Sequence, residues 1–118
     1  MRAFVVGGKA RITSTQGMKL QDWRQAIAQE ARSATESVLS GPVAVNLTFA
    51  LPRPVSRRKR DLWPDRKPDL DKLVRSALDA MSGVVFGDDA QVVELTARKE
   101  YAAPDEQTGV RVKVEEWE

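Results

Sequence analysis

The chain has 118 residues, a length that fits one domain with a single hydrophobic core. It contains no cysteine and no histidine, which excludes a disulfide scaffold, a cysteine-ligated zinc site, nucleophiles paired with histidine, and a histidine general base. The net charge is +2, but residues 53–67 hold seven basic and two acidic side chains (+5), whereas the rest of the chain holds twelve basic and fifteen acidic ones (−3).

Positive charge concentrated in one segment is a candidate contact for a polyanion.

No apolar run is long enough to span a bilayer, and the first residues lack a secretory pattern. We therefore expect no membrane partner and a cytoplasmic protein, either bacterial or made by a phage in the host cytoplasm.

The first half of the chain predicts a strand, a helix and a second strand. Residues 3–6 are apolar and predict a short strand. Apolar side chains at helical spacing predict a helix over residues 19–39, which Gly41 and Pro42 end. Strict alternation predicts a strand over Val43–Leu51 with one buried face. Residues 53–67, the basic loop, have no period and predict a long exposed loop, a kind of segment that is often functional.

The second half predicts a helix followed by two strands. The helix begins at Pro68 and ends at Gly83, and its apolar stripe is Leu70, Leu73, Val74, Ala77, Leu78 and Met81. Alternation predicts strands over residues 91–101 and 110–114. The order β-α-β-α-β-β predicts one α+β domain over residues 1–118, with two helices packed on a mixed sheet.

Acidic residues occupy two places that the fold can bring together. Asp69 and Asp71 lie at the start of the second predicted helix, directly after the basic loop, and Asp88 and Asp89 lie between that helix and the next strand. Carboxylates that converge repel one another, and a divalent cation relieves this repulsion. Mg²⁺ prefers oxygen ligands, polarises a phosphate oxygen and lowers the pKa of its water, which gives a route to phosphodiester hydrolysis without histidine.

Each acidic residue also has a purely structural explanation. Asp69 after Pro68 is typical of a helix cap, and Asp71 four residues before Arg75 is typical of a surface ion pair. Asp88 and Asp89 are typical of a turn. Trp63, in the basic loop, is a candidate either for stacking on an unpaired base or for anchoring the loop on the domain.

Three motifs together resemble those of the RusA-type Holliday-junction resolvases, including their phage-borne branch. The motifs are Lys67-Pro-Asp-Leu-Asp-Lys-Leu73, Leu78-Asp-Ala-Met81 and Asp88-Asp-Ala-Gln-Val-Val93, followed by Lys99 and Tyr101. The resemblance is close over residues 67–101 and loose in the N-terminal part, which includes Gly7 and Arg11.

The resemblance implies a homodimeric, Mg²⁺-dependent endonuclease that nicks two strands of a four-way DNA junction symmetrically in DNA recombination and repair, with Mn²⁺ as a possible substitute ion. It implies Asp69, Asp71 and Asp89 as metal ligands, with Asp88 as a neighbouring helper. Arg75 stands where the family has a lysine; arginine keeps the charge but cannot release a proton. The predicted DNA contacts are Arg57, Arg58, Lys59, Arg60, Arg66, Lys67 and Lys72, which would grip phosphates without reading sequence.

Three other functions stay open from the sequence. A nuclease acting on flaps or forks would use the same metal site. A non-catalytic nucleic-acid-binding module would use the basic loop and leave the aspartates structural. A small phage structural protein would use its charges for solubility alone.

Overall fold

The structure is a computed structural model that describes residues 3–8, 24, 25, 27–29, 31, 32, 38–53, 62–103 and 109–117. Its strands are β1 (Ala3–Gly8), β2 (Val43–Leu51), β3 (Val92–Tyr101) and β4 (Gly109–Glu116). Its helix α2 spans Leu70–Met81, and a 3-10 turn, η1, spans Asp89–Gln91. Between β1 and β2, residues 24, 25, 27–29, 31 and 32 are helical, and we call them the first-helix residues. The predicted α+β class and element order are confirmed.

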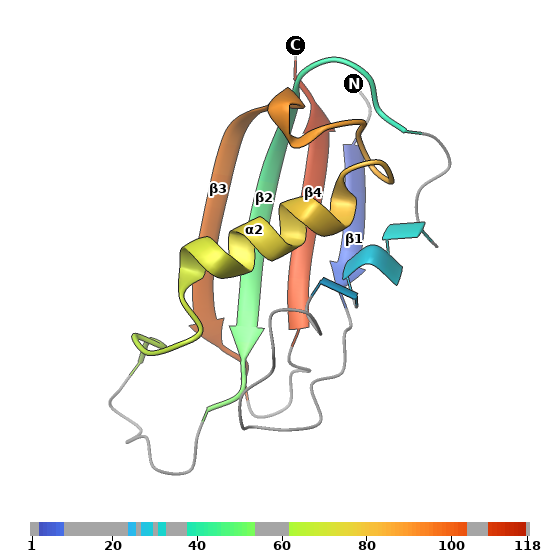
Figure 1. Cartoon of the computed structure of the whole chain (residues 1–118). Coiled ribbons are helices and arrows are strands. Elements are labelled where there is room, and N and C mark those ends of the chain that lie inside the picture. Colours follow the sequence, from blue (N-terminus) through green and yellow to red (C-terminus); the bar gives the residue numbers. More distant parts are fainter. Residues whose placement is uncertain are drawn as a thin grey trace.

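The four strands form one mixed sheet in the order β1-β4-β2-β3. β4 runs antiparallel to both β1 and β2, whereas β2 and β3 run parallel, with Leu47 beside Ala97 and Leu51 beside Tyr101. Parallel neighbours need a crossover, and α2 supplies it. Because α2 runs back across the sheet, it begins beside the carboxyl ends of β2 and β3, while η1 lies at their amino ends (Figure 1).

The described helical segments lie on one face of the sheet, and we call the face that no described helix covers the uncovered face (Figure 1). On the helix-covered face β2 contributes alternate side chains, among them Val45, Leu47 and Phe49, each at most 2% exposed. On the other face Asn46 is exposed, whereas Thr48 and Ala50 are only 7% and 5% exposed. The predicted alternation of burial therefore holds over the first half of β2, and both faces are buried in its second half.

Helix α2 follows the predicted apolar stripe with one addition. Leu73, Ala77 and Met81 are fully buried. Ser76 and Ala80 are buried as well, on the side that faces the first-helix residues. The second helical segment thus widens the contact surface of α2 beyond the stripe that faces the sheet.

Both ends of α2 can be compared with their predictions. Helical backbone begins at Leu70 rather than Pro68, and Asp69 takes the cap position with an extended backbone. Gly83, with φ of 81°, follows the cap residue Ser82, a left-handed conformation that glycine adopts without strain. The prediction that Gly83 ends the helix is confirmed.

The predicted end of the first helix is wrong. Residues 38–40 are not helical, and Leu39 instead forms a β-bridge with Phe86, with its N–H donating to the Val85 carbonyl at 2.7 Å. Leu39, Val85 and Phe86 are all buried. Burial of this apolar cluster against the end of α2 outweighs local helical propensity. The predicted start near residue 19 and Trp23 lie outside the described residues.

Candidate metal centre and nucleic-acid interface

Asp69 and Asp71 lie exposed at the start of α2, and neither is held in a structural role. Asp69 occupies the cap position, yet its carboxylate accepts no hydrogen bond from the helix. The Lys72 Nζ lies 3.9 Å from an Asp69 carboxylate oxygen, a loose pair between exposed side chains. Asp71 forms no ion pair with Arg75 in the described structure. The fold therefore uses neither a side-chain helix cap at Asp69 nor an ion pair between Asp71 and Arg75.

The backbone that leads into α2 is held by a lysine from the neighbouring strand. Lys99 lies on β3, and its Nζ donates to the Arg66 carbonyl at 2.8 Å and to the Pro68 carbonyl at 3.0 Å. These two bonds join the end of the basic loop to the sheet directly before Asp69. The sequence marked Lys99 only as part of the family motif, because a side chain that binds backbone carbonyls far along the chain leaves no local pattern.

We predict that Lys99→Met lowers the free energy of unfolding by about 1–3 kcal/mol, because two hydrogen bonds to a charged group are lost. The start of α2 also loses its tie to β3. Chemical denaturation measures the loss.

The matched control is Lys113→Met. Lys113 pairs with Glu115 on the uncovered face of the sheet, and its side chain is 55% exposed. We expect a change within about 0.5 kcal/mol there. Equal losses in the two variants would mean that Lys99 does not position the helix.

Asp88 and Asp89 have different environments despite being neighbours. Asp88 caps η1: its Oδ1 accepts from the Ala90 N–H at 2.9 Å, and its own N–H donates to the Gln91 Oε1 at 2.9 Å. The Gln91 amide also donates to the Leu39 and Gly41 carbonyls, at 3.2 and 2.7 Å. This capping box ties the turn to the segment before β2 and makes Asp88 a structural residue.

The Asp89 carboxylate is exposed, and charges on α2 act on it. A hydrogen bond with the Asp88 side chain raises the pKa of Asp89, and the negative charge of Asp79 adds to the rise, while the Arg75 guanidinium opposes it. The hydrogen bond from the Ala90 N–H lowers the pKa of Asp88. The charges of Arg75 and Asp79 therefore act on the Asp89 carboxylate, whereas the charge of Asp69 does not.

The single chain does not bring all the predicted metal ligands together. Asp69 and Asp79 are ten residues apart, or about 15 Å along a helix axis. In the described part of the chain, no three acidic side chains gather closely enough to hold an ion. Asp69 and Asp71 lie at the start of α2, whereas η1, which begins at Asp89, lies at the amino ends of β2 and β3 (Figure 1).

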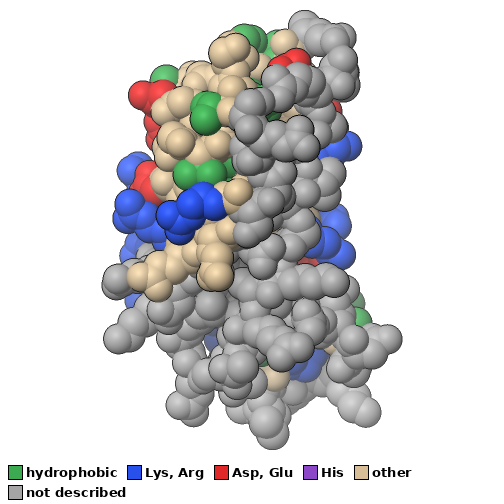
Figure 2. Space-filling model, turned by 90° about the vertical axis from the view of Figure 1, so that its right-hand side faces the viewer, with side chains coloured by type: hydrophobic (Ala, Val, Ile, Leu, Met, Phe, Trp, Pro, Cys, Tyr) green, Lys and Arg blue, Asp and Glu red, His purple; other side chains and the backbone are tan. Residues whose placement is uncertain are grey.

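Of the predicted DNA contacts, three lie near the two carboxylates and four cannot be placed. Arg66, Lys67 and Lys72 are exposed around the start of α2. Arg57, Arg58, Lys59 and Arg60 lie outside the described residues. Trp63 is 60% exposed. On the side shown in Figure 2, lysine and arginine side chains gather at mid-height, and most visible acidic side chains lie above them.

Comparisons with known proteins identify a matching family and a relative. A family model for the endodeoxyribonuclease RusA matches residues 4–115. The chain is also 32% identical to a Bacillus subtilis (strain 168) protein named "Uncharacterized protein YqaN", in an alignment that covers 69% of this chain and 62% of that protein. The chain thus spans less than two thirds of the length of this relative. No helix among the described residues is long and apolar enough to cross a membrane.

Proposed function

Because the chain belongs to the RusA endodeoxyribonuclease family, we propose that it is a Mg²⁺-dependent endonuclease that resolves four-way DNA junctions by paired nicks during recombination and repair. The observation that carries this proposal is the start of α2. Two exposed carboxylates, Asp69 and Asp71, stand there without a structural task, next to Arg66, Lys67 and Lys72. Uncompensated negative charge beside cations suits a site for a metal ion and a phosphate.

The donor set at this end of α2 fits Mg²⁺. The ion takes oxygen ligands and commonly needs only one or two carboxylates, because water and substrate phosphate complete its shell. Asp69 and Asp71 would hold it, and Mn²⁺ would suit the same ligands. When bound, the ion supplies charge stabilisation at the phosphate and acidifies water.

The protein side chains supply position and fixed charge. Arg66, Lys67 and Lys72 would hold backbone phosphates near the two carboxylates, which orients the strand without reading its bases. Arg75, one turn beyond Asp71, would stabilise the charge that develops on the phosphate during hydrolysis. It would act as a permanent cation and not as a proton donor, because a guanidinium does not titrate in this range.

We further propose that Asp89 completes the metal centre across a dimer. Ligands of one Mg²⁺ lie about 2 Å from the ion, and in the described part of a single chain no three acidic side chains gather closely enough to share one. A twofold copy whose α2 runs antiparallel would set Asp69 and Asp71 of one protomer beside Asp89 of the other. Two such centres would match the twofold symmetry of a four-way junction.

The free edge of β3 is the surface that we assign to this dimer. β3 lies at the end of the sheet, and Val93 and Leu95 on it are 55% and 45% exposed. An exposed edge strand with apolar side chains is open to pairing with another strand. Antiparallel pairing of two β3 edges would also make the neighbouring α2 helices antiparallel, as the shared metal centre requires.

Cleavage of a mobile four-way junction, with and without Mg²⁺, tests the proposed function. We expect two symmetric nicks in the junction with Mg²⁺ and none without it. Linear duplex and flap substrates serve as controls in the same assay. Equal or faster cleavage of the flap would indicate a nuclease of another substrate class, and salt-dependent binding without any nick would indicate a binding module.

A further inference from the structure

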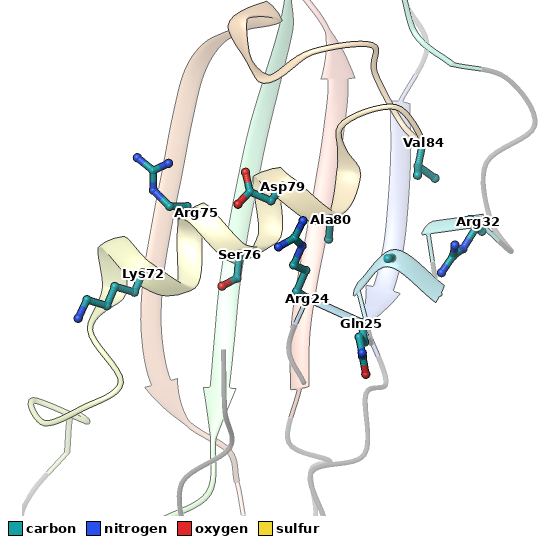
Figure 3. A pocket seen from close by; sticks show the side chains of 10 residues that line it. Arg24, Gln25, Arg32, Lys72, Arg75, Ser76, Asp79, Ala80 and Val84 are labelled. Atoms are coloured by element: carbon teal, nitrogen blue, oxygen red, sulfur yellow. The ribbon is translucent and has the colours of Figure 1, made fainter. Parts of the chain in front are cut away.

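A groove of about 670 Å³ separates the first-helix residues from α2 (Figure 3). Arg24, Ala28 and Arg32 lie on one side at intervals of four residues, so they form one stripe of their helix. On the other side, Lys72 lies near the carboxylate end of α2, and Val84 lies just beyond its last turn. The groove therefore runs along α2 away from the candidate metal centre.

The groove has a strong excess of positive charge. Four cations line it, namely Arg24, Arg32, Lys72 and Arg75, against a single carboxylate, Asp79. In Figure 3 the Arg24 side chain extends toward α2 beside Ala80. Like charges along one groove repel one another, and a bound polyanion relieves that repulsion.

Three of the four cations of the groove form no ion pair. Among the residues that the structure describes, Arg24, Arg32 and Arg75 have no ion-pair partner. The Ser76 hydroxyl also lines the groove, is only 8% exposed and has no hydrogen-bond partner in the same described set. A buried hydroxyl without a partner is costly, and an oxygen-bearing ligand in the groove would satisfy it.

We propose that this groove binds the sugar-phosphate backbone of the DNA strand that continues from the cleaved phosphate, with Arg24 and Arg32 as its phosphate contacts. The inference rests on the proposed function, which places the cleaved phosphate at Asp69 and Asp71. It adds a second DNA-binding element besides the basic loop. The groove is open and elongated, which suits a passing chain of phosphates rather than one small anion. Contacts of this kind position DNA but do not read its sequence.

The test is the salt dependence of junction binding, measured in EDTA so that no cleavage occurs. For the wild-type chain, the logarithm of the binding constant falls linearly with the logarithm of salt concentration. Each phosphate contact contributes about 0.9 to that slope, so Arg24→Gln combined with Arg32→Gln should make it shallower by about one to two units per site. The loss of affinity should be the same for junctions of different sequence.

Three further variants keep the test decisive. Arg24→Lys combined with Arg32→Lys retains the charge and should retain most of the slope. Asp79→Asn removes the carboxylate of the groove and should tighten binding, a gain that a damaged fold would not produce. Arg111→Gln makes the same chemical change on the inner strand β4, on the uncovered face of the sheet where Arg111 pairs with Glu100, and should leave the slope unchanged.

The outcomes separate this proposal from the proposed function. An unchanged slope in the double glutamine variant, with wild-type cleavage in Mg²⁺, overturns the groove and leaves the nuclease intact. A shallower slope in a chain that never nicks DNA supports the groove and overturns the nuclease. A wild-type chain that binds no DNA at low salt overturns both.

Discussion

Asp71→Asn is expected to bind four-way junction DNA as the wild-type chain does and to cleave it at least about a hundredfold more slowly. Loss of groups that merely support metal ligands costs about 10–100-fold in activity or affinity, so loss of a ligand itself should cost more. Binding should persist, because it depends on cations that the substitution leaves in place. If anything, removal of a negative charge near the phosphate should tighten it.

The measurement is single-turnover cleavage beside junction binding in EDTA. Glu115→Gln provides the matched control: it is a carboxylate-to-amide change on the inner strand β4, where Glu115 pairs with Lys113 away from the β3 edge. We expect wild-type cleavage from that control. Cleavage at the wild-type rate by Asp71→Asn would remove Asp71 from the metal centre, and with it the observation on which the proposed function rests.

The periodic elements could be predicted because their periods are set by burial. β2 alternates along its length and α2 repeats its apolar side chains every three to four residues, so each pattern identifies the buried face. Element boundaries were less predictable. Leu39 fits a helical pattern, but it pairs with Phe86 because both are buried beside the end of α2.

The candidate site was predictable in its residues but not in its arrangement. Asp69 and Asp71 are two residues apart in the sequence, and the start of one helix holds both. Whether Asp89 joins them depends on the direction in which α2 crosses the sheet, which no local pattern encodes. The parallel pairing of β2 and β3 fixes that direction and places η1, which begins at Asp89, at the amino ends of both strands.

The structure also distinguishes Asp88 from Asp89, which the sequence pattern does not. Asp88 accepts from the Ala90 N–H and is used as a cap, whereas Asp89 accepts no such backbone hydrogen bond, and charges on α2 act on it. The separation arises because the backbone of Asp88 is extended, which lets its side chain turn back onto η1. Asp89, which the family resemblance predicts as a metal ligand, is the one of the two that does not cap η1.

The groove beside α2 could be predicted only in part from the sequence. Arg24 and Arg32 are eight residues apart and so share a helix face, a spacing that the sequence displays. What the sequence does not display is that this face lies opposite Lys72 and Arg75. Charges on two elements become one binding surface only when packing sets those elements side by side.

A mixed dimer of Asp71→Asn and Asp89→Asn protomers should regain cleavage that neither variant has alone. If Asp89 serves the partner's metal centre, one centre of the mixed dimer combines intact Asp69 and Asp71 with an intact Asp89. The other centre carries both substitutions. We therefore expect one nick per junction instead of two, at a rate per intact centre close to that of the wild-type chain.

The readout is a supercoiled plasmid that extrudes a cruciform. Wild-type dimers should linearise it through paired nicks, whereas purified mixed dimers, selected with two different affinity tags, should stop at the nicked circle. Each variant purified alone should leave the plasmid supercoiled. An inactive mixed dimer, beside an active wild-type dimer carrying the same tags, would mean that Asp71 and Asp89 act within one chain, and α2 would then have to move relative to η1 when DNA binds. The distribution of nicked and linear plasmid thus distinguishes a metal centre formed by two protomers from one formed by a conformational change within a single chain. Only a centre formed by two protomers allows both substitutions to fall in the same centre, which leaves the other centre intact.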